Sequence, residues 1–589
     1  MTIEQIAVAL ILLGALVGFM WGRVRYDIVA LAALLAAVFA GVVPTAEAFS
    51  GFGHPAVITV ACVLVISRAL QASGFVDHIA DWLARKVAGE TGRRAALCTL
   101  GAALSGFMNN VGALALLLPV AVRTTTRPAA MLMPLSFATI LGGMVTLIGT
   151  PPNIVVANAR RLTGEGPFAM FDFAFVGLPL AIVGLAFVVL IGWRLIPNDR
   201  QGRRSAEDLF EINTYIAETR VKEDAACAGK TVRALEGMAE GAVVAGIVRD
   251  GTRRLFNLWL EILRPGDIVL LRADPAVLDR LVSAAGLEIV TDLELTDETL
   301  RSDDVSVTEA VIQPGSRLEG RRVYSVPFRR RYGVALLALA RSGEALGERI
   351  AQARLTAGDV LLLQGDSDGL ADAVAELGCL PLAQRGLSIG RPRRALLAVG
   401  LFAVAIIATV VGVLPAYIAF AAAVLALIAL NVVGTREAYE AVDWPILVLL
   451  GALIPVGNAL QTTGTAGLVA DIVAAFAGAV PAIVLVGLVL VVTMTLSDVM
   501  NNAATAVVMS PIAIGIAERL SLNPEPFLMA VAIGASCAFL TPIGHQNNVL
   551  VMGPGGYRFS DYWRMGLPLE ILIVLVSLPL IAVFWPLAA

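Results

Sequence analysis

The sequence contains little charge for its length and few cysteines. Of its 589 residues, 15% are Asp, Glu, Lys or Arg and 58% are hydrophobic, and the mean hydropathy is +0.81. This composition excludes an ordinary soluble multidomain enzyme and makes a membrane protein the default class. The five cysteines have no paired spacing, and three of them lie in apolar runs. Neither disulfide bonds nor a metal site is therefore indicated.

Other absences exclude whole classes of function. A net charge of −4 provides no basic surface for phosphate backbones, so we expect no nucleic-acid partner. The soluble part contains no histidine-rich metal set, nucleophile elbow or Walker-type phosphate loop, so we expect no enzymatic activity and no organic cofactor. A potassium channel would need a filter such as Thr-Val-Gly-Tyr-Gly, which does not occur in this sequence.

Long hydrophobic runs divide the chain into membrane segments. A span needs roughly 20 apolar residues, which predicts about ten crossings, the first retained as a helix instead of being cleaved as a signal peptide. The runs lie at 5–21, 27–43, 55–72, 131–159, 172–196, 395–413, 416–432, 443–461, 525–551 and 567–587. Two further runs, 95–122 and 482–518, are interrupted by paired asparagines. We expect both to form re-entrant hairpins enclosed by protein.

Most charged residues fall between Asn198 and Arg394, a third of the chain. We therefore expect a first membrane repeat at 1–197, a soluble insert at 198–394 and a second membrane repeat at 395–589. Arginine clusters flank the insert on both sides. The positive-inside rule then places the insert in the cytoplasm, with both termini on the outer side of the inner (plasma) membrane.

The insert itself repeats one pattern, at about 205–290 and again at 300–380. Each copy has β-rich segments and a Gly-Asp turn, at Gly266-Asp267 and at Gly358-Asp359. Each turn is followed by an expected helix: 275–285 and 367–377. The pattern predicts two tandem α/β lobes. A generic spacer domain is the alternative interpretation.

Two motifs of the first membrane repeat return in the second. The run Ser105–Asn110 (Ser-Gly-Phe-Met-Asn-Asn) returns as Ser497–Asn502 (Ser-Asp-Val-Met-Asn-Asn). The Gly/Pro-rich stretch that ends at Asn153 likewise aligns without a gap with the one that ends at Asn548. An odd number of crossings in each half gives the copies opposite orientations. This is the inverted repeat of secondary transporters, whose sites lie near the midplane on broken helices.

The repeated motifs contain groups suited to both a cation and an anion. Gly149 and Gly544 permit a break in a helix, and Pro151, Pro152 and Pro542 remove helix donors there. A broken helix presents free carbonyl oxygens, which together with Ser, Thr and Asn oxygens form a neutral cage for a small hard cation such as Na⁺. The N-termini of the half-helices present N–H groups and positive dipole ends to an anion.

Some of these residues also have a simpler interpretation. The paired asparagines could merely cap two helix ends. Asp498, inside the second hairpin, could assist a cation or carry a proton, or could lie in a wet vestibule. His545 could contact substrate or titrate, or could be satisfied by backbone groups.

At these motifs the chain resembles the divalent anion/sodium symporter family, a branch of the ion transporter superfamily that includes sulfate, dicarboxylate and citrate carriers. The resemblance covers nearly all of both membrane halves. In that family a Ser-Asn-Thr triplet at each hairpin tip binds substrate, and a residue four positions earlier joins the Na⁺ site. Here the triplets read Asn109-Asn110-Val111 and Asn501-Asn502-Ala503, with Ser105 and Ser497 upstream. Only the central asparagine is kept, so the cation sites match the family better than the anion site.

The motifs and the resemblance together define the candidate site. The substrate-binding candidates are Asn109, Asn110, Asn501, Asn502, Thr150, Asn153, His545 and Asn548. The candidate ligands of the coupling Na⁺ are Ser105, Asn110, Thr146, Gly149, Ser497, Asn502, Thr541 and Gly544.

The insert resembles tandem TrkA C-terminal lobes, which regulate potassium conductance, often dimerise and bind small ligands. The family resemblance also implies a homodimer with an elevator-type mechanism. The expected protein is thus an α-helical polytopic membrane protein with an inverted repeat, re-entrant hairpins, broken helices and a cytosolic insert of two lobes. The leading expectation is Na⁺-coupled symport of a small divalent oxyanion, foremost sulfate. A di- or tricarboxylate (citrate-like) carrier, a proton-coupled anion carrier and a cation/proton antiporter are the alternatives.

Overall fold

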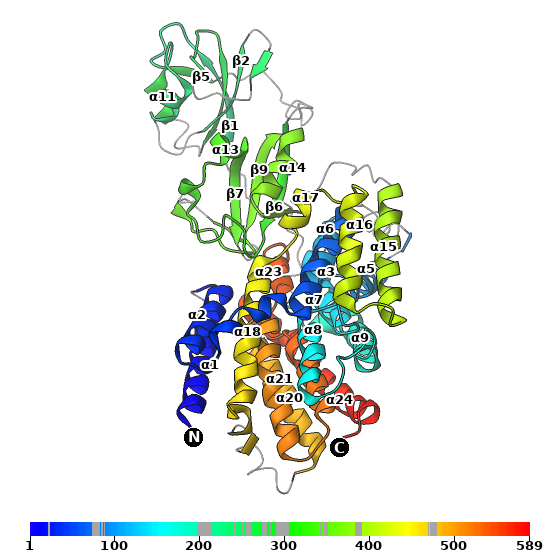
Figure 1. Cartoon of the computed structure of the whole chain (residues 1–589). Coiled ribbons are helices and arrows are strands. Elements are labelled where there is room, and N and C mark those ends of the chain that lie inside the picture. The colour runs from blue at the N-terminus through cyan, green and yellow to red at the C-terminus, as the bar shows by residue number, and fades with distance from the viewer. Residues whose placement is uncertain are drawn as a thin grey trace. The chain divides into compact units, whose positions relative to one another are not determined.

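The structure is a computed structural model of the full chain (Figure 1). It describes residues 1–21, 24–72, 83, 86–87, 89–125, 127–197, 215–238, 243–249, 252–254, 261–273, 280–282, 284–289, 305–341, 344–346, 352–382, 392–468, 470–471 and 480–588. The arginine cluster before the insert and part of the helix expected at 275–285 lie outside these residues. The chain divides into two compact units, each treated by itself below. One comprises 1–203, 308–363 and 371–589, and the other 204–307 and 364–370.

Helices make up the N-terminal third of the chain. They are α1 (Ile3–Trp21), α2 (Tyr26–Phe39), α3 (Pro55–Ala72), α5 (Glu90–Ser105), α6 (Asn110–Thr124), α7 (Pro128–Gly143), α8 (Pro151–Ala159) and α9 (Ala174–Leu190), with short 3-10 turns η1 (Thr45–Glu47), η2 (Ser50–Gly53), η3 (Arg160–Thr163) and η4 (Gly192–Leu195). The expected hairpin at 95–122 corresponds to α5 and α6. The expected span at 131–159 is not one helix but two, α7 and α8, because Gly149 and the two prolines that follow it interrupt the run.

The C-terminal third has a similar series. Its helices are α15 (Pro392–Val410), α16 (Ala416–Ala429), α17 (Thr435–Glu440), α18 (Trp444–Thr462), α20 (Ala482–Ser497), α21 (Asn502–Arg519), α22 (Pro524–Ser536), α23 (Gln546–Met552) and α24 (Tyr562–Phe584), with the 3-10 turn η9 (Phe559–Asp561). The expected hairpin at 482–518 corresponds to α20 and α21. The expected span at 525–551 is divided into α22 and α23 by the segment 537–545.

Several helices have the length and composition of membrane spans. Among the described residues, four are long and apolar enough: Ile3–Trp21, Thr45–Gln71, Trp444–Thr462 and Phe559–Phe584. Shorter apolar helices, which include α7 before the first break, accompany them. The outer faces of α1 and α24 carry exposed Leu10, Leu13, Leu575 and Val583. Exposed apolar faces on helices long enough to span a bilayer are typical of membrane proteins, since water would not favour them. The chain is therefore a membrane protein with several apolar helices.

The insert contains two antiparallel sheets with one common strand order. The strands are β1 (Tyr215–Val221), β2 (Val243–Arg249), β3 (Thr252–Arg254), β4 (Ile268–Ala273) and β5 (Leu287–Ile289), then β6 (Val305–Ile312), β7 (Ala335–Arg341), β8 (Glu344–Ala345), β9 (Val360–Asp366) and β10 (Cys379–Pro381). The first sheet has the order β3-β2-β4-β1-β5 and the second β8-β7-β9-β6-β10. The strands thus correspond one to one. The short helices are α11 (Val232–Glu236), α13 (Phe328–Tyr332) and α14 (Ser367–Glu376), with the 3-10 turn η7 (Val323–Ser325).

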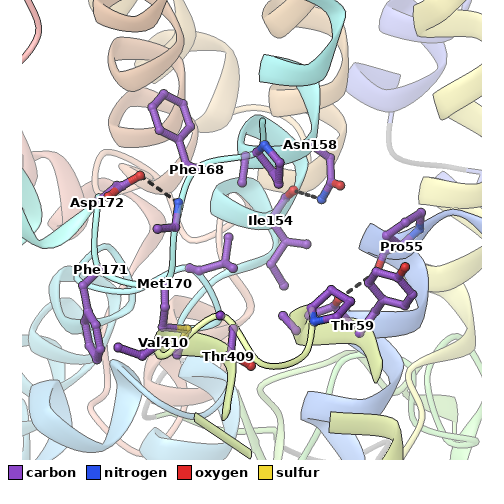
Figure 2. A pocket seen from close by; sticks show the side chains of 18 of the residues that line it. Pro55, Thr59, Ile154, Asn158, Phe168, Met170, Phe171, Asp172, Thr409 and Val410 are labelled. Atoms are coloured by element: carbon purple, nitrogen blue, oxygen red, sulfur yellow. Dashed lines mark hydrogen bonds between the residues drawn. The ribbon is translucent and has the colours of Figure 1, made fainter. Parts of the chain in front are cut away.

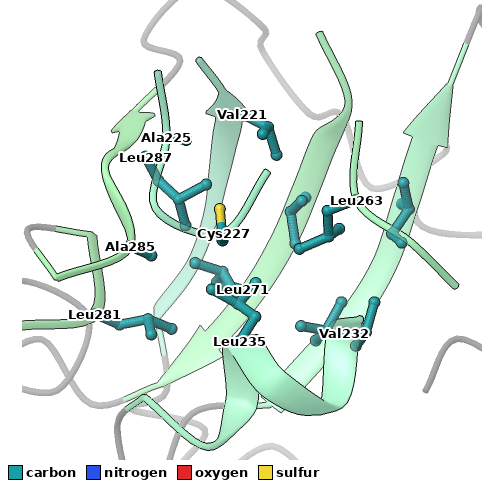
Figure 3. Packing of buried hydrophobic residues seen from close by; sticks show 13 residues of the cluster. Val221, Ala225, Cys227, Val232, Leu235, Leu263, Leu271, Leu281, Ala285 and Leu287 are labelled. Atoms are coloured by element: carbon teal, nitrogen blue, oxygen red, sulfur yellow. The ribbon is translucent and has the colours of Figure 1, made fainter. Parts of the chain in front are cut away.

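The two lobes also repeat one ion pair between an arginine and a buried aspartate. Arg249 Nε donates to Asp267 Oδ1 at 2.8 Å, and Arg341 Nε donates to Asp359 Oδ1 at 2.7 Å. The other oxygen of each aspartate accepts a backbone N–H three residues earlier in the chain. The aspartate of each Gly-Asp turn identified in the sequence therefore binds both an arginine and a backbone N–H of its own lobe. In the first lobe, apolar side chains on β1, β4 and α11 pack around Cys227, Leu263 and Leu271 (Figure 3).

Candidate functional site

The two asparagines at the tip of the first hairpin make different contacts. Asn109 precedes α6, and its Oδ1 accepts the Val111 N–H at 3.1 Å, which caps the helix. Asn110 begins the helix and is 3% exposed. Its Oδ1 accepts a 2.6 Å hydrogen bond from Ser105 Oγ at the end of α5. The serine and the central asparagine of the motif are thus joined, while the capping interpretation holds for Asn109.

The second hairpin repeats the cap but not the serine contact. Asn501 Oδ1 accepts the Ala503 N–H at 2.9 Å, and Asn502 Oδ1 lies 2.8 Å from the same nitrogen. Ser497 Oγ donates instead to the Ala535 carbonyl at 2.6 Å. Asn502 and Ser497 are therefore not bonded to each other, and Asn502 is less buried than Asn110.

Each helix break is bonded to the hairpin of its own half by a threonine, and an asparagine of the same half bonds to the carbonyl of that threonine. Thr146 Oγ1 donates to the Gly106 carbonyl, and Thr541 Oγ1 donates to the Asp498 carbonyl. Asn153 Nδ2 donates to the Thr146 carbonyl at 2.9 Å, and Asn548 Nδ2 donates to that of Thr541 at 3.2 Å. The paired residues of the sequence motifs thus make paired hydrogen bonds in the structure.

The two break glycines are required by close packing. A Cβ on Gly149 would lie 2.9 Å from the Ser105 carbonyl oxygen, and a Cβ on Gly544 would lie 2.5 Å from that of Ser497. Both distances are shorter than any ordinary contact, so no side chain fits at either position. The absence of a side chain lets the backbone of each break approach the serine that ends the first helix of the hairpin.

The first hairpin meets the break of the other half in a buried network. Asn110 Nδ2 lies 3.1 Å from His545 Nε2. Asn547 Nδ2 donates to the Asn110 carbonyl at 3.1 Å and to Thr139 Oγ1 at 2.7 Å. His545 itself caps α23, because its Nδ1 accepts the Asn547 N–H at 3.1 Å. His545 is therefore satisfied on one side by backbone and on the other by the hairpin asparagine.

The helices also pack across the two halves. Helix α23 packs on α6 and α7, and α8 packs on α21 and α22. Each short helix after a break thus lies against a hairpin helix of the opposite half. The N-termini of α6 and α23 meet through the contacts of Asn110. The structure does not join all predicted residues in one cluster, since no hydrogen bond among the described residues links Asn110 with Asn502.

Two polar atoms at the starts of the helices that follow the breaks are buried without a protein partner. They are Thr150 Oγ1, at the residue before α8, and Asn547 Oδ1. Buried polar atoms without a partner usually serve a ligand, an ion or a water molecule. Thr150 is among the predicted site residues, but Asn547 is not. Asn547 was not predicted, because it aligns with Pro152 of the first repeat and so has no polar counterpart there. Its place in the polar run Gln546-Asn547-Asn548 could have indicated it.

A buried acid, Asp498, is a further polar feature near the second break. Asp498 is 3% exposed, so it does not lie in an open vestibule. Its Oδ1 accepts the Leu540 N–H at 2.9 Å, at the start of the second break. Sequence reasoning did not single out Glu570 of α24, which interacts with Asp498. An acid within an apolar helix was the available signal.

A cavity of about 540 Å³ lies beside the first break and is separate from the network (Figure 2). Its wall is largely apolar, and several of its polar side chains are engaged with the backbone. Asn158 Nδ2 donates to the Ile154 carbonyl, and Asp172 Oδ2 accepts the Ala169 N–H. None of the predicted site residues lines this cavity. It is therefore not the predicted ion site.

Comparisons with known proteins agree on the class of protein. A family model described as citrate transporter matches residues 16–534 and 485–589. An uncharacterized transporter of Synechocystis sp. is 33% identical over 580 residues, which covers 96% of this chain and 94% of that protein. The uncharacterized transporter YfbS of Escherichia coli is 30% identical over 99% of both chains. Sodium/sulfate cotransporter 1 of Chlamydomonas reinhardtii is 27% identical over 62% of this chain and 42% of that protein.

Proposed function

This chain belongs to the citrate transporter family, whose members are transporters and not enzymes, and from that premise we propose that it is a secondary active transporter for a small divalent oxyanion. We assign Na⁺ as the coupling ion and sulfate as the first candidate substrate. A di- or tricarboxylate such as citrate is the second candidate.

One observation carries the proposal: both halves attach a helix break to a hairpin through the same residue types. Thr146 and Thr541 hold the break against the hairpin carbonyls, and Gly149 and Gly544 bring it against the serine carbonyls. A scaffold that only faces lipid does not need a duplicated, closely packed and buried arrangement of this kind. It is the expected setting of an ion site on broken helices.

The Na⁺ sites would be formed by neutral oxygens in each half. In the first, Ser105 and Asn110 side chains and backbone oxygens beside Thr146 and Gly149 are the proposed ligands. Their counterparts at the second site are Ser497, Asn502, Thr541 and Gly544. Hard neutral oxygens suit Na⁺, and no thiolate or imidazole is required. Among the described residues, no group of three or more His, Cys, Asp or Glu side chains gathers as a multivalent metal site would demand.

The anion would bind where Asn110, His545 and Asn547 meet. This network contains amide and imidazole groups and no arginine or lysine. A divalent anion at a neutral buried site needs compensation, because an unpaired buried charge is costly. Helix N-termini provide part of it, and co-bound Na⁺ would provide the rest. This requirement for compensation is the physical reason for proposing symport.

The names of the relatives support two substrate classes. The matching family model is described as citrate transporter, and distant relatives are named as sodium/sulfate cotransporters. The hairpin triplets lack the hydroxyl residues of dicarboxylate carriers, which favours sulfate here. The remaining elements of the proposal are an inverted repeat, a homodimer working as an elevator in the plasma membrane, and cytosolic lobes of the TrkA C-terminal type that bind a small regulatory ligand.

Uptake into proteoliposomes tests the proposal. Labelled sulfate, succinate and citrate are offered separately, each with an inward Na⁺ gradient and with an equal K⁺ gradient. We expect sulfate uptake that needs Na⁺. Citrate or succinate uptake with Na⁺ would move the substrate to the second candidate, and uptake of none of the three would refute the proposal.

A further inference from the structure

The cavity beside the first break lies at the ends of several apolar helices. Around it α9 begins at Ala174 and α16 at Ala416, while α15 ends at Val410. Phe175, in the first turn of α9, lines the cavity and stacks on Phe584, the last residue of α24, with 4.9 Å between the ring centroids. The ends of membrane-spanning helices mark the boundary between hydrocarbon and lipid headgroups. The cavity therefore lies at such a boundary.

The apolar wall of the cavity has an inner and an outer part. The inner part consists of buried side chains: Leu147, Ile154, Phe168 and Met170. The outer part consists of apolar side chains that are 38–52% exposed: Phe171, Phe175, Val410 and Leu414. Ile154, Met170 and Val410 lie around the same space in Figure 2. A space whose wall and rim are both apolar accepts a hydrocarbon chain from the bilayer and disfavours a hydrated ion.

Among the described residues, two charged side chains line the cavity, Arg161 and Asp172. Asp172 Oδ2 accepts the Ala169 N–H at 2.7 Å, and its Oδ1 has no hydrogen-bond partner within the described chain. Arg161 is exposed, and its guanidinium has neither a hydrogen bond nor an acidic partner there, whereas the neighbouring Arg160 is paired with Glu525. One positive and one negative group are thus available to a ligand.

One neutral polar group of the wall is available as well. The Tyr417 hydroxyl, in the first turn of α16, forms no hydrogen bond with the described residues. Thr59, Asn158 and Thr409 instead donate to backbone carbonyls four residues earlier in their own helices. A ligand of this cavity therefore needs a long apolar part, an anionic acceptor for the guanidinium and the phenol, and a cationic donor for the carboxylate.

We propose that this cavity binds a phospholipid whose headgroup carries an ammonium group beside its phosphate, as phosphatidylethanolamine does. An acyl chain occupies the apolar part. The phosphate accepts hydrogen bonds from Arg161 and Tyr417, and the ammonium group donates to Asp172. An anionic headgroup without an amine leaves the carboxylate beside a second negative charge, and a choline headgroup has no N–H to donate. The two charges of the wall therefore select a zwitterionic headgroup with a primary amine.

The position of the cavity connects the lipid to the first break. Leu147, which lies between Thr146 and Gly149 in the break, lines the cavity, and its N–H donates to the Met170 carbonyl at 2.9 Å. Another part of the wall comes from the turn between α15 and α16 in the second half. A bound acyl chain therefore contacts the break and the other half at once. An effect of the lipid on uptake rests on the proposed function, but lipid binding itself does not.

Native mass spectrometry of the full chain in detergent tests the headgroup preference without a transport assay. Phosphatidylethanolamine, phosphatidylglycerol and phosphatidylcholine with identical acyl chains are titrated separately. The wild-type protein should bind phosphatidylethanolamine at least about tenfold more tightly than either other lipid, as one charged hydrogen bond predicts. Asp172→Asn keeps an acceptor for the Ala169 N–H and should abolish this preference. Arg161→Gln should weaken the binding of all three lipids about tenfold.

A matched control and the contrary outcomes make this measurement decisive. Arg436→Gln changes an exposed arginine of α17 that is not among the residues lining the cavity, and this protein should bind lipid like the wild type. Wild-type protein that binds phosphatidylglycerol as tightly as phosphatidylethanolamine overturns the proposal. So does Arg161→Gln protein that binds phosphatidylethanolamine as tightly as the wild type does.

Photocrosslinking locates the bound lipid. Phosphatidylethanolamine with a diazirine in one acyl chain is bound to the wild-type protein and irradiated, and the labelled peptides are identified by mass spectrometry. We expect labels on the segments 167–172 and 409–417, which an excess of unlabelled phosphatidylethanolamine removes. Labels confined to the exposed faces of α1 and α24 would show bulk lipid only and would overturn the proposal. Neither experiment involves Na⁺ or sulfate, so failure of the lipid site and failure of the proposed function are distinguishable.

Discussion

Asn110 Nδ2 lies 3.1 Å from His545 Nε2, although 435 residues separate these two in the sequence. The contact joins the tip of the first hairpin to the cap of the helix after the second break. It places a residue from each half on one buried polar network. Any ligand bound between them would contact both halves at once, which is what a transport site between two repeats requires.

The asparagines of the first hairpin should differ sharply on mutation. Asn110→Ala removes the partner of Ser105 and of His545, and leaves these buried groups unpaired at a cost of about 1–3 kcal/mol each. Sulfate uptake should fall at least about tenfold. Asn109→Ala removes only a helix cap, worth about 1 kcal/mol, and should keep most of the uptake. Equal effects of the two changes, at equal amounts of folded protein, would speak against the assignment of Asn110.

The second hairpin should show a parallel effect on uptake but a smaller effect on stability. Asn502→Ala removes an amide that the proposed second Na⁺ site uses, yet its Oδ1 shares the Ala503 N–H with Asn501. We expect uptake to be lost while the melting temperature and oligomeric state stay close to those of the wild type. Size-exclusion chromatography and thermal unfolding provide the control measurements. Near-normal uptake would remove Asn502 from the site.

The serines should control the Na⁺ requirement. Ser105→Ala and Ser497→Ala each remove a hydroxyl ligand without touching the amide donors for the anion. The Na⁺ concentration for half-maximal uptake should rise about tenfold, while the maximal rate changes less. Ser105→Ala should have the larger effect, because it also frees Asn110 Oδ1. An unchanged Na⁺ dependence in both variants would count against them as ligands.

The break glycines should not tolerate a methyl group. A Cβ at Gly149 or Gly544 would overlap a hairpin carbonyl, so Gly149→Ala and Gly544→Ala must push the break away from the serine. Uptake should be abolished and the melting temperature lowered. Gly400→Ala, in α15, is the matched control because no atom lies within 4 Å of its Cβ position. Active Gly544→Ala protein would show that the close approach is dispensable.

The ion pair of the first lobe predicts an acid-sensitive insert. Burial alone would raise the pKa of Asp267, but the hydrogen bonds from Arg249 and from the Arg264 N–H outweigh it and lower that pKa below 3.8. Because the folded pKa is lowered, its stabilisation is present above the ordinary pKa and disappears as pH falls through the folded value. Asp267→Asn removes the buried carboxylate while Arg249 keeps Glu261 as an acidic partner, and it should destabilise the lobe by about 1.5–3 kcal/mol at neutral pH, as loss of a charged hydrogen bond does. Limited proteolysis of the full chain measures this, and wild-type protection in the variant would contradict it.

The insert should be dispensable for transport itself. All paired motifs lie before Asn198 or after Arg394. A chain in which a flexible linker of sufficient reach joins Pro197 to Pro392 should therefore fold, dimerise and take up anion, with a changed rate or a lost response to a cytosolic ligand. A folded dimer that binds neither Na⁺ nor anion would assign part of the site to the lobes.

The sequence predicted local features well and contacts between distant segments poorly. Paired asparagines, glycines and prolines act within a few residues, so the hairpins at Asn110 and Asn502 and the breaks at Gly149 and Gly544 were found where the structure has them. The contact of Asn110 with His545 depends on how the two halves pack, and no local pattern encodes it. Glu570 was missed because a single acid hardly changes the hydropathy of a long apolar run.

The most direct test of the central claim is the initial rate of labelled sulfate uptake into proteoliposomes, with the membrane potential clamped and the inward Na⁺ gradient varied. The account predicts that uptake rises with the Na⁺ gradient, that an equal K⁺ gradient does not replace it, and that the Asn110→Ala protein responds to neither. Uptake by the wild-type protein that is equally fast without Na⁺, or that persists in the Asn110→Ala protein, would contradict it.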